Sequence, residues 1–355
     1  MRKAAISCGI LGVILLVAAG LMAWWITPSY IARIPSNYNK TRTYDGTISR
    51  LLDPAAFASG NLAGAVKTGL PATLTDHVKV LQTSGNTARV QDTRTIATSG
   101  TVISSTTWQY AVNRSSLQAT SSHPSDWKVT PATGLTVSWP LGAKKQTYTG
   151  WFPLTHTTTP LTYVNQAQQG GITTYEYHAA VPPTPIRDRQ VLASLPAAIP
   201  AALMARLSAS GILPAGDAAA VAKAYPHATS IPLGYTYQAS NNYFVAPPTG
   251  LVVNVSNNET EMGGIALPGG KIIPLFPVLA DTYHASPSSL SAAVNDANNG
   301  SSTITTWGVA VPIAAAAVGF LLVLAAILLW LRGRSRGRPV QYAPPARHPS
   351  PTGVR

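Results

Sequence analysis

Hydrophobic and polar positions divide the chain into two apolar ends and a long polar middle. Residues 4–26 and residues 307–331 each form a continuous apolar run without a charged side chain. At about 1.5 Å of rise per residue, a helix over either run is long enough to cross a hydrocarbon core of about 30 Å. The pattern therefore predicts a transmembrane helix at each end, with a separate domain over residues 27–306.

Basic residues flank both apolar runs on the side away from the middle of the chain. They are Arg2 and Lys3 before the first run, and Arg332, Arg334, Arg336 and Arg338 after the second. Cytoplasmic flanks are enriched in Lys and Arg, so we expect residues 1–3 and residues 332–355 to be cytoplasmic. This predicts a two-pass plasma-membrane protein with an extracytoplasmic middle domain and a basic, Pro-rich, disordered tail.

A cleaved signal peptide is the alternative interpretation of the first apolar run. Cleavage requires small residues at positions −3 and −1, but Leu21 would occupy −3 if Ala23 occupied −1. Trp24 and Trp25 follow, and paired aromatic side chains are typical of a membrane interface. We favour a retained anchor.

The middle of the chain has the pattern of a mainly β (α+β) domain with antiparallel strands. Short runs rich in Val, Ile and Thr alternate with turns containing Gly, Asn and Asp. Strands are expected over residues 77–83, 87–97, 101–112, 134–139, 159–166, 173–181, 235–238, 243–246, 250–256 and 271–275. Residues 27–50 are interpreted as an extended connector, and residues 286–303 as a polar linker to the membrane.

A segment rich in Ala and Leu, about residues 190–225, interrupts the strand pattern and predicts a short helical insert. Two helices are expected, over residues 200–207 and 215–225. The insert is interpreted either as a cap on the open edge of the sheet, which we favour, or as a lid or membrane-facing apex. In the second case its apolar side chains are candidate lipid contacts: Leu203, Met204 and Leu207.

A net charge of +13 is typical of nucleic-acid-binding proteins, but the distribution of the charge along the chain does not favour that function here. Eight of the 25 basic residues lie in the two cytoplasmic ends, which leaves 17 basic against 12 acidic residues in the middle. The basicity therefore mainly reflects topology, and no nucleic-acid partner is predicted. The single cysteine, Cys8, lies in the first apolar run, so we expect the middle domain to fold without a disulfide.

No motif in the sequence predicts catalysis, a metal site or a cofactor. The histidines are scattered singly, and neither HExxH, CxxC nor Gly-x-Ser-x-Gly occurs. Glu259 and Glu261 are expected in a solvated loop, and the Arg187-Asp188-Arg189 cluster is expected to form a structural ion pair. We therefore predict a protein that is not an enzyme, with a cell-wall hydrolase only as a remote alternative.

Three aromatic and turn motifs resemble those of one known family. The residues that carry the resemblance are Trp139, Pro140, Gly142, Lys144, Lys145, Tyr148 and Trp151, then Tyr175 and Tyr177, then Thr249 and Gly250, with a third motif over residues 108–114. Together with the two apolar ends, they are similar to an actinobacterial family of two-span envelope proteins, formerly a domain of unknown function and now labelled PorA-like porin. Phe152 and Asn113 stand where family members commonly have Asp. We interpret the motifs mainly as turn and packing signatures.

The resemblance implies a role in the cell envelope. Some members are linked to glycolipid (trehalose mycolate) trafficking beside a lipid exporter and to lipoglycan maturation. Our leading hypothesis is a membrane-anchored protein whose outer domain binds or helps to traffic a lipid or glycolipid, with a lipid-export or envelope-assembly protein as partner. The alternatives are a porin subunit that forms a channel by oligomerising, and a scaffold for envelope enzymes.

Overall fold

The computed structural model describes residues 2–31, 33–59, 61, 64–209 and 211–335, which fall into two compact units. A helical unit comprises the described residues up to Ile31 and from Thr305 onward, and a sheet unit comprises those between Ala32 and Ile304. The basic tail predicted to be disordered lies largely outside the described residues.

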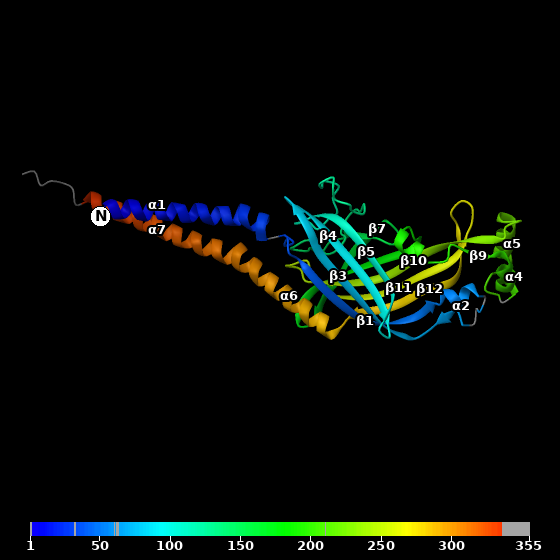
Figure 1. Cartoon of the computed structure of the whole chain (residues 1–355). Coiled ribbons are helices and arrows are strands. Elements are labelled where there is room, and N and C mark those ends of the chain that lie inside the picture. The colour runs from blue at the N-terminus through cyan, green and yellow to red at the C-terminus, as the bar shows by residue number, and fades with distance from the viewer. Residues whose placement is uncertain (1, 32, 60, 62–63, 210, 336–355) are drawn as a thin grey trace, which may run out of the picture. The chain divides into compact units, whose positions relative to one another are not determined.

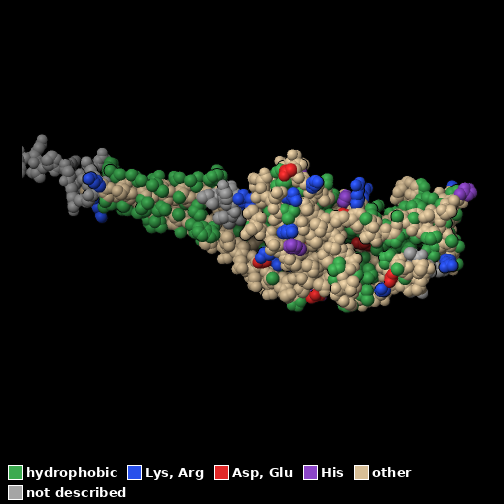
Figure 2. Space-filling view, viewed as in Figure 1, with side chains coloured by type: hydrophobic (Ala, Val, Ile, Leu, Met, Phe, Trp, Pro, Cys, Tyr) green, Lys and Arg blue, Asp and Glu red, His purple; other side chains and the backbone are tan. Residues whose placement is uncertain are grey.

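The helical unit contains two helices that are long and apolar enough to cross a membrane. Its segments are α1 (Arg2–Leu21), the π-helix η1 (Met22–Ile31), the π-helix η2 (Thr306–Ala310) and α7 (Val311–Ser335). The helices α1 and α7 approach closely where two glycines meet: a Cβ on Gly12 would lie 2.7 Å from the carbonyl oxygen of Gly319. Figure 2 shows hydrophobic side chains over most of the visible surface of these helices. They have the composition and the exposed apolar surface of membrane spans.

The sheet unit is built on one antiparallel sheet. Its strands are β1 (Asn39–Leu52), β2 (Val66–Lys67), β3 (Leu70–Ser84), β4 (Thr87–Thr98), β5 (Thr101–Asn113), β6 (Tyr148–Phe152), β7 (Thr157–Gln169), β8 (Ile172–Pro185), β9 (Ala198–Pro200), β10 (Ser230–Val245), β11 (Val252–Ala266) and β12 (Ile272–Ala285). The order is β5-β4-β3-β1-β12-β11-β10-β8-β7-β6, with β2 beside β1 and β9 beside β10. The predicted fold class, mainly β with short helices, is confirmed.

The sheet bends back on itself and encloses its core. In Figure 1, β3, β4 and β5 cross β10, β11 and β12. Bulges support this curvature, for example where the pairing of β11 with β12 shifts between Gly263 and Gly264. A Cβ on Gly264 would collide with the carbonyl oxygen of Ile273, so only glycine fits this bend.

The outer edge of β5 is covered by the segment that follows β8. Asp188 accepts hydrogen bonds from the backbone of Gln190 and Val191 and so caps the helix α3 (Arg189–Ala193). The indole Nε1 of Trp108 donates to Asp188 Oδ2 at 2.8 Å. The side-chain amide of Gln190 bonds both the backbone oxygen and the backbone nitrogen of Thr107, at 2.8 and 3.4 Å.

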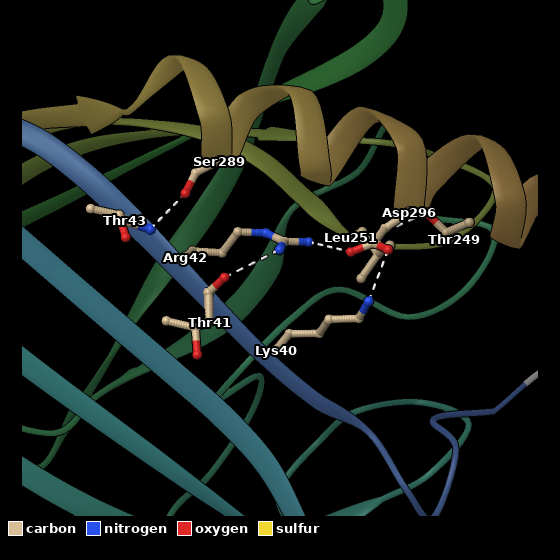
Figure 3. A network of polar contacts seen from close by, with 8 residues as sticks. All are labelled: Lys40, Thr41, Arg42, Thr43, Thr249, Leu251, Ser289 and Asp296. Atoms are coloured by element: carbon tan, nitrogen blue, oxygen red, sulfur yellow. Dashed lines mark hydrogen bonds and ion pairs between the residues drawn. The ribbon is translucent and has the colours of Figure 1, made fainter.

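Helix α6 (Pro287–Thr305) packs on the sheet unit through small and polar side chains. Ala293 and Ala297 are buried in a cluster with Ala246 and Val253. Figure 3 shows the polar contacts beside it: Asp296 accepts from both Lys40 (2.9 Å) and Arg42 (2.6 Å) of β1, and Ser289 Oγ accepts from the backbone nitrogen of Thr43. The remaining helices are α2 (Pro54–Ala58), α4 (Ala201–Ala209) and α5 (Ala215–Ala224).

The expected strands over residues 235–238 and 243–246 are parts of one strand, β10. Three further expected elements differ from the structure. The expected connector contains β1, which pairs with both β3 and β12, and the expected polar linker forms α6. Residues 134–139 form no named strand, although Leu135 makes isolated bridges. In each case the local hydrophobic pattern is weak. Contacts with neighbours in the fold determine the conformation instead.

Candidate binding cavity

A cavity of about 350 Å³ lies inside the bent sheet, and we refer to it as the outer pocket. Its walls are mainly apolar and come from β1, β4, β5, β12 and the end of α3. The main apolar residues are Leu51, Ile96, Ile103, Leu195, Val278 and Leu279. Lys67 and Asp53 also line it and form a partly exposed ion pair at 3.0 Å. The pocket therefore combines an apolar wall with a polar, solvent-accessible side.

A buried ion pair forms the inner wall of the outer pocket. The guanidinium of Arg94 on β4 donates to both carboxylate oxygens of Glu259 on β11, at 3.2 and 2.6 Å. Asn257 adds a hydrogen bond to Glu259 at 2.6 Å, and Arg94 lies over the ring of Tyr283. Burial favours the protonated acid, but the charge of Arg94 and the hydrogen bonds from Arg94, Asn257 and Tyr237 together outweigh it and hold the pKa of Glu259 below its usual value. Glu259 is therefore ionised and firmly positioned.

Beyond this pair lies a second cavity of about 170 Å³, which we call the inner chamber. Arg94, Glu259, Trp108 and Leu154 line both cavities, so the ion pair stands between them. The rest of the chamber wall is rich in aromatic and polar side chains: Tyr44, Asp76, Asp92, Thr136, Trp151, Tyr237, Asn241, Tyr243, Asn257 and Tyr283. The inner chamber is thus the more polar of the two cavities, although Leu74, Phe152 and Val255 also line it.

Further carboxyl groups near the pair have raised pKa values. Burial, with the nearby charge of Glu259, raises the pKa of Glu261 to about 7 and that of Asp281 to about 7. Asp281 lies directly opposite Glu259 in the pairing of β12 with β11. Burial also raises the pKa of Asp76 and of Asp92, which interact with each other. Near neutral pH this interior therefore carries less negative charge than its five carboxyl groups suggest.

Strand alternation explains why these polar residues face inward, and it corrects one expectation. Glu259 is buried on β11 and is not in a solvated loop, and Glu261 lines the outer pocket. Val255 and Asn257 have the same parity along the strand as Glu259, are also buried, and also line the inner chamber. The run of Asn, Ser, Glu and Thr resembled a loop in composition. The preceding Val255 was the signal that one face is internal.

Asp188 also has a different role from the expected ion pair with its neighbours. It is buried, and it caps α3 and accepts from Trp108, whereas the basic side chain that lies within 4.0 Å of its carboxylate is that of His156, through Nε2. The strand β5 and the loop after β6 enclose the Asp188 carboxylate. The charged side chains of Arg187 and Arg189 require solvent, so they do not share this buried position.

The aromatic motif residues form a packed cluster beside the inner chamber. The ring centroid of Trp139 lies 5.2 Å from that of Tyr177, and Tyr177 contacts Tyr148 edge to face. The backbone of Lys144 bonds both tyrosine hydroxyls, while Lys145 lies over the ring of Tyr175 at 5.5 Å. Among the motif residues, Trp151 also lines the inner chamber. These contacts describe a packing role for the cluster.

Two motif turns interlock behind this cluster. The turn after Trp139 and Pro140 bonds to the turn after β10: Gly142 N donates to Pro248 O, and Trp139 N donates to Gly250 O. Gly142 and Gly250 both have φ +68°. Thr249 Oγ1 accepts from the backbone of Leu251 at 3.4 Å.

At the positions where the chain departs from the family pattern, Asn113 Oδ1 accepts from two backbone nitrogens and Phe152 is buried. The nitrogens are those of Ser115 and Ser116, both at 3.0 Å. Asn113 therefore accepts the same backbone hydrogen bonds in this turn that an aspartate could accept. Phe152 instead forms part of the apolar wall of the inner chamber.

The candidate lipid contacts lie away from both cavities. Leu203 and Leu207 of α4 are buried in the main core, and Met204 packs against it. None of the three lines the outer pocket or the inner chamber. Their assignment as lipid contacts stays a prediction. Of the residues that line the cavities, Trp108 and Trp151 belong to the sequence motifs and Glu259 and Glu261 were placed in a loop; most of the others were not singled out from the sequence.

The structure defines a class of membrane protein with two apolar helices and an antiparallel β unit that encloses a cavity. A family model described as Porin PorA matches residues 4–328. The chain therefore belongs to the Porin PorA family. The match supports the PorA-like label and a porin-like membrane role, which was our alternative hypothesis.

Comparisons with individual proteins add little to this assignment. No curated protein matches the chain. Among solved structures, an acyl-CoA thioesterase II, TesB2, from Mycobacterium marinum is 14% identical, with 70% of this chain and 80% of that chain covered and a TM-score of 0.13. A putative thioesterase from Novosphingobium aromaticivorans is 9% identical, with 75% and 84% covered and a TM-score of 0.11. Neither similarity supports a functional argument.

The interlocking turns predict unequal costs for two similar substitutions. Gly142→Ala should lose about 1–2 kcal/mol of unfolding free energy, because its left-handed φ disfavours a Cβ that meets no other atom within 4 Å. Gly250→Ala has the same φ, but its Cβ would collide with the carbonyl oxygens of Trp139 and Pro140. It should lose at least about 2 kcal/mol more. Urea unfolding followed by tryptophan fluorescence measures both, and equal losses would contradict this packing.

The raised pKa of Glu261 predicts a pH-dependent stability difference. Its folded-state pKa is about 7, whereas an unfolded glutamate titrates near about 4.3. The extra proton stabilises the folded state fully below the unfolded value, and this contribution is lost as the pH rises through about 7. Glu261→Gln should therefore gain Tm relative to wild type between about pH 5 and about pH 8. The control is Asp126→Asn at an exposed position, whose Tm should vary with pH as that of the wild type does. If the Tm of Glu261→Gln also varies with pH in parallel with the wild type, the raised pKa of Glu261 is refuted.

Proposed function

We propose that this Porin PorA family member is a membrane-anchored binding protein whose sheet unit holds the apolar part of an amphiphilic lipid in the outer pocket. The observation that carries the proposal is a mainly apolar cavity of about 350 Å³ inside the bent sheet. A lipid chain gains free energy by leaving water for such walls, at about 25 cal/mol per Å² of apolar surface. The family match itself is silent on lipid binding.

The proposal includes a location and a mode of action. Both termini are cytoplasmic, as the basic flanks suggest, and the two helices anchor the sheet unit outside the plasma membrane. The protein acts without catalysis, by binding a lipid or glycolipid and presenting it to a lipid-export or envelope-assembly protein. A role as a scaffold for envelope enzymes is the outcome if the pocket takes no lipid.

Native mass spectrometry of the full chain released from detergent tests the lipid proposal. The wild type should retain one lipid per chain, either from the host or after incubation with a phospholipid mixture. Ser104 lines the outer pocket from β5, so Ser104→Trp should fill the space and abolish retention. Ser105 is its exposed neighbour on the opposite face, so Ser105→Trp should retain the lipid. A folded wild-type chain that carries no lipid and takes none up would refute the proposal.

A second candidate function is a pore subunit, favoured by the family match over residues 4–328. Two helices per chain form a conduit only when several copies assemble. The close approach of Gly12 and Gly319 shows how the helices of one copy pair, and their large exposed side chains are apolar.

Planar-bilayer recording of the purified full chain tests the pore candidate. A pore subunit should give stepwise conductance, and Gly12→Leu should abolish it because the added side chain separates α1 from α7. Gly20→Leu is the matched control, because a Cβ there meets no atom within 4 Å. Silent bilayers containing folded wild-type protein would exclude the pore.

A further inference from the structure

One end of the sheet unit follows directly on the first apolar helix. Antiparallel pairing brings the start of β1 and the ends of β3, β5, β10 and β12 to this end. The helical unit ends its first segment at Ile31, and Ile34 is already held by the end of β5. The Ile34 carbonyl accepts from Nε and Nη2 of Arg114 at 3.0 and 2.9 Å, and Ile34 N donates to the Arg114 carbonyl. The first residues after the helix are therefore fixed to the sheet.

Helix α6 ties the same end of the sheet to the second apolar helix. Figure 3 shows Thr249, in the turn after β10, beside α6. A Cβ on Gly300 of α6 would lie 2.8 Å from Cγ2 of Thr249. Only seven positions separate Gly300 from the start of the apolar run at Trp307. Seven residues span about 10 Å as a helix and no more than about 25 Å when fully extended. Chain length alone therefore keeps this turn near the membrane.

Two exposed lysines lie beside this turn. Gly142 N and Ala143 N donate to carbonyl oxygens of the turn after β10, and Lys144 and Lys145 follow them directly in the chain. Lys144 bonds the neighbouring tyrosines through its backbone, and Lys145 lies over the ring of Tyr175. Among the described residues, no ion pair involves the ammonium group of either lysine. Both charges are therefore open to an anion from outside the chain.

Arginine adds positive charge to the same end. Arg33 precedes Ile34 and is partly exposed, whereas Arg114 lies behind it and is only 6% exposed. Burial, and then repulsion from the charge of Arg33, lowers the pKa of Arg114. The acid that α6 brings to this end, Asp296, is already bonded to two basic residues of β1. An anion near Arg33 would relieve this repulsion, and phosphate matches the donor geometry of a guanidinium group.

We propose that this end of the sheet unit docks on the phosphate headgroups of anionic phospholipids, through a basic rim formed by Arg33, Lys144 and Lys145. The partner is the surface of the membrane in which the apolar helices lie. The short connections at both ends of the sheet unit keep the rim at a high effective concentration near that surface. Basic side chains next to a membrane span are attracted to anionic lipid. No residue of the rim lines the outer pocket, so docking does not require a lipid in that pocket.

Fluorescence quenching in lipid nanodiscs tests the docking on the full chain. Cys8→Ala removes the single cysteine, and Gln146→Cys places a fluorophore next to the two lysines. Nitroxide-labelled headgroups then quench the fluorophore when the rim lies on the lipid surface. Quenching should be stronger in discs with about one third phosphatidylglycerol than in discs of phosphatidylcholine alone. Salt at about 0.5 M should remove this difference, because it screens the attraction.

Paired charge variants identify the residues responsible. Lys144→Gln/Lys145→Gln should lower the ratio of docked to undocked chains roughly twentyfold, at about fivefold for each lysine near an anionic surface. The matched control is Arg187→Gln/Arg189→Gln, which removes two exposed charges beyond the opposite end of β8 and should be quenched like wild type.

Ser104→Trp separates this inference from the lipid proposal. It fills the outer pocket but leaves the rim unchanged, so its quenching should match that of wild type whether or not the pocket holds a lipid. Equal quenching of the wild type in the two kinds of disc would overturn the docking inference. Undiminished quenching of a folded Lys144→Gln/Lys145→Gln chain would overturn it as well.

Discussion

The interior of the sheet unit depends on the ion pair between Arg94 and Glu259. These residues lie on β4 and β11, which β3, β1 and β12 separate in the sheet. A contact of 2.6 Å between them is possible only because the sheet bends back on itself. Two charges buried together are tolerated when each satisfies the other, and removing one partner typically costs about 3–5 kcal/mol. The pair therefore joins two distant parts of the bent sheet and stands between the outer pocket and the more polar inner chamber.

The two cavities differ in the chemistry of their walls. The outer pocket and the inner chamber share the Arg94 and Glu259 side chains but differ in wall composition. An amphiphile has the same division within one molecule, with an apolar chain and a polar head. The family assignment concerns the whole chain, including both apolar helices, while the cavity belongs to the sheet unit alone. The two observations address different parts of the protein and do not compete.

The local hydrophobic pattern was sufficient to predict part of the fold. The rest of the fold depends on contacts between residues that are far apart in the sequence. The apolar ends and the strands β3 to β5 follow from periodicity within short windows. In contrast, β1 has few hydrophobic residues, and it forms a strand because β3 and β12 bond to both its edges. The cavity was beyond prediction, because Arg94 and Glu259 are 165 positions apart in sequence. The motif around Trp139 and Tyr177 was predicted to pack, but nothing local indicated that Trp151 also borders the chamber.

The amide of Gln190 has a consequence for how copies of this protein meet. An outer strand normally presents backbone groups to which a strand of another molecule can add, which leads to aggregation. On β5 the backbone oxygen and nitrogen of Thr107 are both occupied by this amide, and residues 109, 111 and 112 are paired by the following loop. The chain therefore occupies the backbone groups of this part of the β5 edge with its own atoms. A strand of another molecule cannot add to β5 over residues 107–112 without first displacing these contacts.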